Sequence, residues 1–351
     1  MPAVRSLHLP VLGCPLSYRV SLIESDIAFD VEPHETVLAA ALRAAVNLPH
    51  DCKSGTCGTC RFKLIDGAVE YAEPPMGLEP EEAEAGIALA CQARPLSDIV
   101  AEAEIMPSLL PDPIRCQSRI VSLDRLAADV VHLKLALVDG IDLAYLPGQH
   151  INIVLEDGST RSFSLASRPS GDGTIDLHVR QIPGGLFTEG RLATLAAGDA
   201  LDVELPLGSF FLRDDFRPLI MVATGTGLAP IKSIIEALMD DPAPPPVALY
   251  WGMRTEADLY LHDEILSWAE KLEDFRYVPV LSRPSDGWTG RRGYVQDAVV
   301  EDVDDIEEHA IYLCGSPGMI SAAKGLFLGR GASVNHIYTD SFLFQHNRGG
   351  S

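Results

Sequence analysis

Apolar and polar residues follow three different rhythms along the 351-residue chain. Near the N-terminus, YRVSLIES and DIAFDVEP predict strands, and ETVLAAALRAAV predicts a helix that precedes a cysteine-rich loop. Between residues 116 and 215, six short β-like runs separated by turns predict a small antiparallel β-barrel. After residue 216, apolar runs such as LIMVAT alternate with helical segments such as PIKSIIEALMD. That alternation predicts a parallel sheet built from βαβ units.

Two breaks in the pattern suggest where the domains end. MPSLLPDPIR contains three prolines in ten residues and predicts an extended linker over residues 106–115. A second break falls near residues 214–218, before LIMVAT. We therefore expect a domain over residues 1–105, a barrel domain over 116–215 and an α/β domain over 216–351.

The charge of the chain excludes some classes of partner. The formal net charge is −23, whereas nucleic-acid binding and docking on anionic membranes need basic surfaces. No apolar run approaches the ~20 residues of a membrane helix. The N-terminal apolar stretch is interrupted by His8 and Pro10, so we expect no secretory signal. These features predict a cytoplasmic protein that binds neither nucleic acid nor membrane and meets a protein partner through an acidic surface.

A cluster of cysteines carries the strongest chemical signal. The spacing is Cys52-x4-Cys57-x2-Cys60-x30-Cys91, which is the plant-type spacing for the four ligands of a 2Fe-2S cluster. Zinc is the alternative, but structural zinc sites usually pair two CxxC motifs, and only Cys57 and Cys60 form one here. Seven cysteines in so long a chain favour metal ligands in a reducing compartment over disulfides.

The residues between these cysteines are small for a physical reason. Three ligands from one short loop must wrap around a compact group while backbone N–H groups turn toward its sulfur atoms. Gly55 and Gly58 allow the backbone angles that this requires, and Lys53 is free to point toward water. CKSGTCGTCRFKLIDGAVEY resembles the plant-type ferredoxins over about residues 18–105, and this resemblance implies an α+β fold of the β-grasp type.

Three motifs in the middle block share one resemblance. PGQHINI, RSFSLAS and PGGLFT, in this order, resemble the FAD-binding domain of the ferredoxin–NADP reductase superfamily. Its Arg-x-Tyr-Ser motif binds FAD, and here Phe163 replaces the Tyr; FMN is the alternative flavin. The resemblance implies that Arg161 pairs with a pyrophosphate oxygen and that the Ser164 hydroxyl lies near flavin N5.

The PGGLFT turn is expected to serve the flavin phosphates. Gly184 and Gly185 would let backbone N–H groups approach them, and Thr188 would cap the following helix. The complete set of flavin-binding residues implied by the resemblance is Arg161, Ser162, Phe163, Ser164, His178, Arg180, Gly184, Gly185, Leu186 and Thr188.

The segment LIMVATGTGLAPIKSII predicts a strand, a glycine-rich turn and a helix. A helix N-terminus behind such a turn favours a pyrophosphate. The Rossmann fingerprint is absent, because Pro230 takes the place of its third glycine and no acidic residue follows the second strand. The same superfamily shows this departure, followed by motifs like WGMRTEADLY, LSRP and YLCGSPGMI. The implied nucleotide-binding residues are Gly225, Thr226, Gly227, Pro230, Arg254, Ser282, Arg283, Gly315 and Met319.

Four residues are candidates for the reacting centre. Besides Ser164, the resemblance implies that Cys314 lies beside the nicotinamide, although a buried strand-end cysteine is the simpler interpretation. In the terminal segment YTDSF, Phe342 would face the flavin and Asp340 would lie near the reacting atoms. Arg283 is suited to the 2′-phosphate of NADPH, but similar bacterial oxygenase reductases favour NADH as the donor.

The whole chain resembles the reductase components of bacterial multicomponent oxygenases, and equally the CDP-6-deoxyglucoseen reductases. The resemblance implies an NADH-dependent oxidoreductase that passes electrons through FAD and a 2Fe-2S cluster to an oxygenase component, or alternatively to an iron–sulfur sugar dehydratase. A redox sensor and a zinc-stabilised adaptor are functions from other classes. A sensor would predict a degraded nicotinamide pocket, yet the glycine turns are intact.

Overall fold

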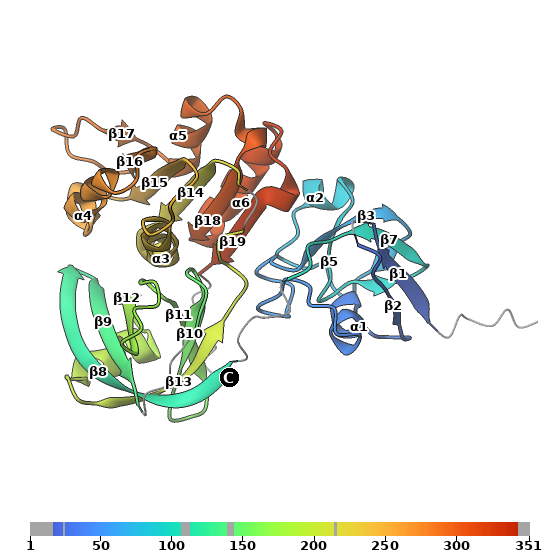
Figure 1. Ribbon diagram of the computed structural model, residues 1–351, viewed down its shortest axis with the longest axis horizontal. Coiled ribbons are helices and arrows are strands. Elements are labelled where there is room, and N and C mark those ends of the chain that lie inside the picture. Colours follow the sequence, from blue (N-terminus) through green and yellow to red (C-terminus); the bar gives the residue numbers. More distant parts are fainter. Residues whose placement is uncertain (1–16, 24, 107–112, 139–143, 214–215, 343–351) are drawn as a thin grey trace, which may run out of the picture. The chain divides into compact units, whose positions relative to one another are not determined.

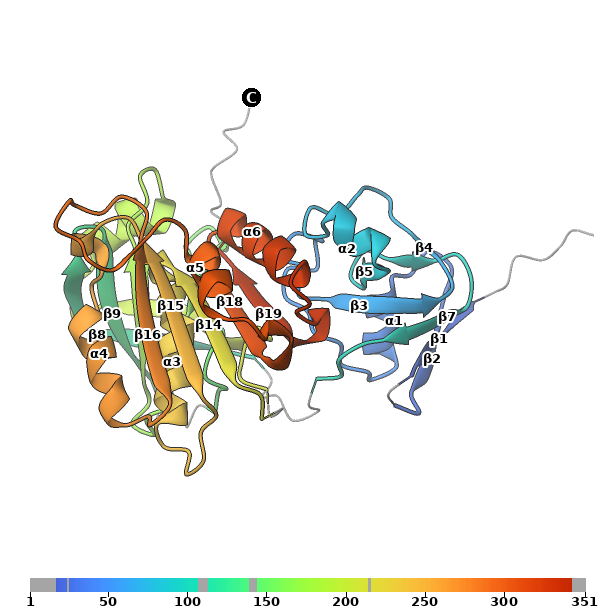
Figure 2. The same cartoon turned by 90° about the horizontal axis from the view of Figure 1, so that it is seen from above.

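The computed structural model places the chain in two units, residues 1–106 and residues 107–351. The second unit contains both the barrel and the α/β part (Figures 1 and 2). Most of the predicted linker, residues 107–112, lies outside the described residues. The structure describes residues 17–23, 25–106, 113–138, 144–213 and 216–342.

The first unit is built on a five-stranded sheet of order β2-β1-β7-β3-β5. Val20 lies opposite Phe29 on the antiparallel neighbour and opposite Ile99 on the parallel neighbour. The helix α1 packs its buried apolar residues into the same core, and Thr36 caps it by accepting a 3.2 Å hydrogen bond from the Ala39 N–H. The elements are β1 (Tyr18–Leu22), β2 (Ala28–Val31), α1 (Val37–Arg43), β3 (Arg61–Asp66), β4 (Val69–Glu70), α2 (Pro80–Glu84), β5 (Ile87–Leu89), β6 (Arg94–Pro95) and β7 (Ile99–Glu102).

The predicted barrel is a six-stranded antiparallel sheet of order β11-β10-β13-β8-β9-β12. A bridge between Leu165 and Leu177 joins its two edges directly after β11, so the sheet closes on itself. Ile175, Leu177 and Val179 alternate along β12 into the barrel core. The elements are β8 (Ile114–Ala127), β9 (Val130–Leu137), β10 (His150–Val154), β11 (Thr160–Ser164), β12 (Thr174–Arg180), the π-helix η1 (Leu186–Arg191), η2 (Leu192–Thr194) and β13 (Ala200–Leu207).

The predicted βαβ pattern gives a six-stranded sheet of order β17-β16-β15-β14-β18-β19, in which every pairing is parallel. One face packs against α3 and α4, and the other packs against α5 and α6. Figure 1 shows α3 on the side of the sheet that faces the barrel. The elements are β14 (Leu219–Thr224), η3 (Gly225–Gly227), α3 (Leu228–Leu238), β15 (Val247–Met253), η4 (Glu256–Asp258), α4 (His262–Ser267), η5 (Trp268–Glu270), β16 (Phe275–Leu281), β17 (Arg291–Arg292), α5 (Val295–Asp302), η6 (Ile306–Glu308), β18 (Ala310–Gly315), α6 (Pro317–Leu328), η7 (Val334–His336) and β19 (Ile337–Ser341).

The predicted fold class is confirmed: an α+β unit of the β-grasp type, an antiparallel barrel and a parallel α/β sheet. Two details differ from the sequence pattern. The run DEILSWAEKLE, residues 263–273, has a helical pattern but folds as α4 followed by the 3₁₀ turn η5. The helix α6 begins before its apolar run MISAAKGLFL because Ser316 caps it. None of the helices within the described ranges has the length and apolar character of a membrane crossing.

Candidate functional site

The four predicted cluster cysteines come together through the pairing of β3 with β5. Cys60 directly precedes β3, and Cys91 follows β5 by two residues. Because Arg61 lies opposite Leu89 in the antiparallel pair, the two cysteines lie at the same end of it. The Cys91 N–H donates to the Cys60 sulfur at 3.5 Å. The loop before β3 supplies Cys52 and Cys57.

The thiols associate in two pairs. A hydrogen bond from the Cys57 thiol lowers the pKa of Cys52 to about 3. A hydrogen bond from the Cys60 thiol likewise lowers the pKa of Cys91. Within the described residues, no three His, Cys, Asp or Glu side chains are grouped around a position for a single metal ion. Two cysteine pairs instead match a cluster of two irons, in which each iron takes two thiolates.

Backbone donors surround these sulfur atoms, as the sequence predicts. The N–H groups of Ser54 and Cys57 each donate to the Cys52 sulfur at 3.4 Å. The Thr59 N–H donates to the Cys57 sulfur at 3.5 Å. The Thr59 hydroxyl, which donates to the Asp51 carboxylate at 2.8 Å, lies 3.2 Å from the same sulfur. Gly55 and Gly58 have positive φ angles of 75° and 72°, which directs these amides inward. A ring of donors suits anionic sulfur, so the loop fits the cluster.

Arg61 supports the cysteine loop, and the sequence analysis missed it. Its guanidinium donates to the Gly58 carbonyl, to the Gly77 carbonyl at 2.7 Å and to Glu82 at 2.9 Å. The Glu82 carboxylate is almost fully buried, so this ion pair is shielded from water. The position of this arginine, directly after the last cysteine of the loop, was the sequence signal that could have indicated its role. Its partner on α2 could not be predicted from the sequence.

Three of the four candidate catalytic residues meet in the second unit. The Ser164 hydroxyl, at the end of β11, donates to the Asp340 carboxylate at 3.2 Å. The Cys314 thiol lies 3.8 Å from the same carboxylate oxygen, because Cys314 and Asp340 are register partners in β18 and β19. Burial raises the pKa of the Cys314 thiol, and the Asp340 carboxylate raises it further. Cys314 is therefore a neutral thiol beside a carboxylate.

The fourth candidate, Phe342, lies one residue beyond β19. Its backbone N–H donates to the Gly315 carbonyl at 2.9 Å, so it remains tied to the end of β18. Its half-buried ring packs at the margin of the core on the α3 side of the sheet. The last described residue of the chain is thus held next to the Cys314 and Asp340 pair.

The RSFSLAS motif lies on β11, which pairs with β10. The Phe163 ring packs on Phe187 with a centroid separation of 5.4 Å. Ser162 is exposed and donates to the Asn152 side chain at 2.7 Å. The Arg161 guanidinium donates only to the nearby Thr160 carbonyl and Ser159 hydroxyl. Among the residues that the structure describes, the Arg161 guanidinium forms no ion pair with a carboxylate, so its charge is suited to a phosphate.

The PGGLFT turn fits an anion, with one correction to the sequence analysis. The Gly184 N–H donates to the Glu189 carboxylate. This amide therefore points in a direction from which it can donate to an anionic group. A Cβ on Gly185 would meet the Thr188 hydroxyl at 2.3 Å, so this position excludes side chains. The prediction that Thr188 caps the helix was wrong. Gly185 is the N-cap, and the Thr188 hydroxyl within η1 instead accepts from the Ile182 N–H at 3.2 Å.

The glycine turn after β14 packs closely against the end of β18. A Cβ on Gly227 would lie 2.3 Å from the Cys314 carbonyl oxygen, and one on Gly315 would lie 2.2 Å from the Thr224 hydroxyl. The absence of these Cβ atoms therefore brings the turn directly beside Cys314. Pro230 falls in the first turn of α3, and Met319 in the first turn of α6.

Arg254, Ser282 and Arg283 lie just beyond the carboxyl ends of β15 and β16, the edge where parallel sheets bind ligands. The Arg283 N–H donates to the Arg254 carbonyl at 2.8 Å, so the two residues are neighbours. Both side chains are exposed. They provide positive charge at this edge of a strongly acidic chain.

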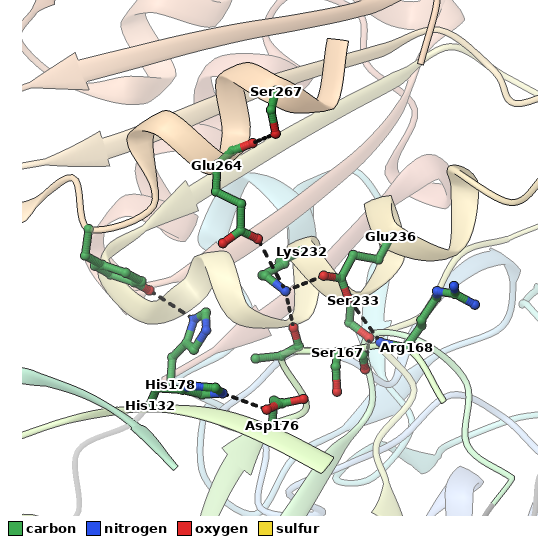
Figure 3. Close-up of polar contacts among 12 residues, drawn as sticks. His132, Ser167, Arg168, Asp176, His178, Lys232, Ser233, Glu236, Glu264 and Ser267 are labelled. Atoms are coloured by element: carbon green, nitrogen blue, oxygen red, sulfur yellow. Dashed lines mark hydrogen bonds and ion pairs between the residues drawn. The ribbon is translucent and has the colours of Figure 1, made fainter. Parts of the chain in front are cut away.

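His178 and Arg180 lie on the face of β12 opposite to Leu177 and Val179, which point into the barrel core. The His178 ring lies within 3.3 Å of the Tyr260 hydroxyl (Figure 3). Burial lowers the pKa of His178 to about 3, and the Lys232 charge adds to this shift. Arg180 pairs with Asp129 at 2.9 Å and lies beside Gly225, at 3.5 Å from the position of its absent Cβ.

An open, shallow depression of about 660 Å³ lies on the surface of the barrel. Leu186 is the member of its lining that the sequence predicted for flavin binding. The other lining residues are Leu155, Glu156, Asp157, Arg191, Thr194, Leu195, Asp199 and Ala200.

Three family models match successive parts of the chain. The model described as a 2Fe-2S iron-sulfur cluster binding domain matches residues 21–96. The oxidoreductase FAD-binding domain matches residues 117–212, and the oxidoreductase NAD-binding domain matches residues 221–325. Each match contains the residues that the sequence analysis assigned to the corresponding cofactor, apart from the terminal Asp340 and Phe342.

Known proteins resemble the chain over nearly its full length. The CDP-6-deoxy-L-threo-D-glycero-4-hexulose-3-dehydrase reductase of Yersinia pestis is 36% identical over 93% of this chain and 99% of its own. The aromatic O-demethylase reductase subunit of an Amycolatopsis species is 37% identical over 89% of this chain and 95% of its own. The crystal structure of the Amycolatopsis cytochrome P450 reductase GcoB has a TM-score of 0.68 and covers 93% of this chain and 98% of its own, at 37% identity.

Proposed function

The chain belongs to the family of iron–sulfur flavoprotein reductases that these relatives represent, and from that membership we propose how its residues divide the work. It is an NADH-dependent oxidoreductase with 2Fe-2S, FAD-binding and NAD-binding domains. Its bound flavin supplies the conversion between a two-electron hydride donor and one-electron transfer. The chain's own residues bind and orient the reactants.

We assign hydride transfer to the region around Ser164. The single observation that carries this assignment is the hydrogen bond between Ser164 and Asp340. Through the Asp340 carboxylate, the hydroxyl of the strand assigned to the flavin lies near the Cys314 thiol on β18, beside the turn assigned to the nucleotide. Asp340 fixes the orientation of this hydroxyl. Phe342, one residue beyond β19, would cover the region around Ser164 and Cys314.

The binding residues surround this centre in two groups. Arg161 and the Gly184 and Gly185 turn would hold the flavin phosphates, and Phe163 would offer its aromatic ring to the flavin. The Gly225–Gly227 turn would hold the pyrophosphate of NADH at the start of α3. Cys52, Cys57, Cys60 and Cys91 would hold the cluster through their two pairs.

We propose an oxygenase component as the protein that receives the electrons. Relatives named as reductases of terephthalate 1,2-dioxygenase and of xylene/toluene monooxygenase are each 34% identical to this chain over 93% of its length. A deoxysugar dehydratase is the second candidate, supported by the hexulose-3-dehydrase reductase of similar identity. NADH-driven turnover of a purified terephthalate dioxygenase component and of a purified hexulose-3-dehydrase would distinguish the two.

Cofactor content tests the assignment most simply. The purified protein should be red-brown and contain two irons and one FAD per chain. Zinc without iron would contradict the cluster assignment, and protein without flavin would contradict the role of the barrel. Rapid bleaching of the flavin band on mixing with NADH should then show that hydride reaches the site.

A further inference from the structure

One face of α3 holds the chain directly after the flavin-binding strand. The Lys232 ammonium donates to the Ala166 carbonyl at 3.3 Å. The Ser233 hydroxyl donates to the Ser167 carbonyl at 2.6 Å, and the Arg168 N–H donates to the Glu236 carboxylate at 3.4 Å. Figure 3 shows these side chains pointing from the helix toward the same stretch of backbone.

These contacts involve backbone groups of three consecutive residues, 166 to 168. An ion pair reinforces these hydrogen bonds, because the Arg168 guanidinium lies 2.5 Å from the Asp240 carboxylate just beyond α3. Because α3 forms hydrogen bonds with three successive residues of the neighbouring loop, it fixes the path of the loop backbone. Moving the loop would leave buried polar groups without hydrogen-bond partners. Ser233 is itself fully buried, so water does not replace its hydrogen bond.

The barrel holds the same stretch from the other side. The Ala166 N–H donates to the Asp176 carbonyl at 2.7 Å, and the Leu165 N–H donates to the Gln149 carbonyl at 2.9 Å. The Tyr145 hydroxyl donates to the Ser167 carbonyl at 2.8 Å. Residues 165–168 are therefore shared between the barrel and α3, and they begin one residue after Ser164.

Lys232 makes its contact at an energetic cost. Its side chain is only 12% exposed, and buried ammonium groups are destabilising unless they are paired. The Glu236 carboxylate pairs with it, and Glu264 on α4 lies 3.7 Å away. A methionine would fill similar space without desolvating a charge. Beyond packing, the ammonium adds these ion-pair contacts and the hydrogen bond to the Ala166 carbonyl.

We propose that α3 is a positioning element for hydride transfer, with Lys232 and Ser233 as its positioning residues. The inference rests on the proposed function. The N-terminus of α3 carries the Gly225–Gly227 turn assigned to the nucleotide, and its body holds the backbone that follows Ser164. One rigid helix thus sets the separation between the nucleotide site and the flavin-side hydroxyl. Lys232 and Ser233 act through Ala166 and Ser167 without touching either reactant.

Lys232→Met tests this role in the flavin-loaded protein. Small misplacements of reacting atoms can reduce rates by up to about 10²-fold. We expect single-turnover flavin reduction at saturating NADH to slow between about 10- and 100-fold per bound FAD. The Kd of NADH should change by less than about twofold, because Lys232 touches no nucleotide residue. Lys232→Arg should restore part of the rate, and Lys271→Met, the same change at an exposed site, should react like the wild type.

Ser233→Ala provides an independent test if Lys232→Met does not fold. It removes one hydrogen bond with almost no change in volume, so we expect a rate loss of about 2- to 10-fold. Wild-type flavin reduction in Ser233→Ala, or in a folded Lys232→Met protein, would overturn the positioning role. Failure of the proposed function would look different, because the wild-type flavin itself would then not be reduced by NADH.

Discussion

The Ser164 hydroxyl donates a 3.2 Å hydrogen bond to Asp340, a residue 176 positions further along the chain. Ser164 ends a strand of the barrel, and Asp340 lies on the outermost strand of the parallel sheet. This bond is therefore formed only when the barrel and the nucleotide-binding sheet are assembled. It links the two halves of the proposed hydride-transfer site.

Replacement of Ser164 by alanine should slow flavin reduction by NADH while FAD remains bound. Loss of one positioned hydrogen bond in a catalytic site costs on the order of 10²-fold in rate. Stopped-flow absorbance at the flavin band measures this rate directly. Ser122→Ala, at a half-buried serine on β8, is the matched control. An unchanged Ser164→Ala trace would remove Ser164 from the mechanism.

Replacement of Arg283 by alanine should separate the two nicotinamide coenzymes. Only NADPH has a 2′-phosphate, and a hydrogen bond to a charged group contributes about 1.5–3 kcal/mol. We therefore expect the KM for NADPH to rise at least about tenfold, whereas the KM for NADH stays within about twofold. Steady-state kinetics with both coenzymes measure this, with the exposed Arg330→Ala as control. An equal change in the KM for NADPH and the KM for NADH would show that Arg283 does not bind the 2′-phosphate.

Burial of neutral His178 should make the second unit sensitive to acid. Its pKa is lowered to about 3 in the folded protein, whereas an unfolded histidine titrates near 6.5. Between these values only the unfolded state takes up the proton. The free energy of unfolding should therefore fall as the pH decreases, by up to about 1.4 kcal/mol per pH unit from this residue.

His178→Gln provides the comparison for this acid effect. The variant should be less stable than the wild type at pH 7, and the difference should narrow as the pH falls below about 6.5. All three tryptophans, Trp251, Trp268 and Trp288, lie in the α/β part of the second unit, so their fluorescence during denaturation reports this unit. A difference that stays constant between pH 7 and pH 4 would mean that His178 is accessible to protons when folded.

The first and last residues of the long apolar strands could be predicted from the sequence. The sequence runs VVHLKLAL, LIMVAT, VALYWGM and AIYLCG coincide with β9, β14, β15 and β18. Three of these are inner strands of a parallel sheet, buried on both faces, and such strands consist of continuous apolar residues that end abruptly. The cysteine spacing was equally informative because one loop contains three of the four predicted ligands.

Contacts between distant segments could not be predicted from the sequence. The helical run PIKSIIEALMD gives no indication that Lys232 contacts the barrel, and only the folded chain brings it to the Ala166 carbonyl. The Arg61 and Glu82 pair depends on the short helix α2, whose sequence has no apolar periodicity that would predict a helix. Thr188 was misassigned because a threonine three residues after a glycine pair resembles a cap, whereas the turn of helix already begins at Leu186.

The central claim is that electrons leave this protein through the cluster held by the two cysteine pairs. Cys60→Ser removes one predicted ligand and should abolish the cluster. The second unit has its own apolar cores, so it should still fold and retain FAD. Cys116→Ser, at a half-buried cysteine on β8, is the control that should keep both cofactors.

The decisive measurement compares two NADH-driven activities of Cys60→Ser, each per bound FAD. Reduction of the two-electron dye dichlorophenolindophenol should proceed at the wild-type rate. NADH-driven turnover of the purified oxygenase component should fall below about one hundredth of the wild-type rate, because an exit through the cluster requires all four ligands. A cluster-free variant that still drives the oxygenase component at the wild-type rate would show that electrons leave directly from the flavin, and would contradict this account.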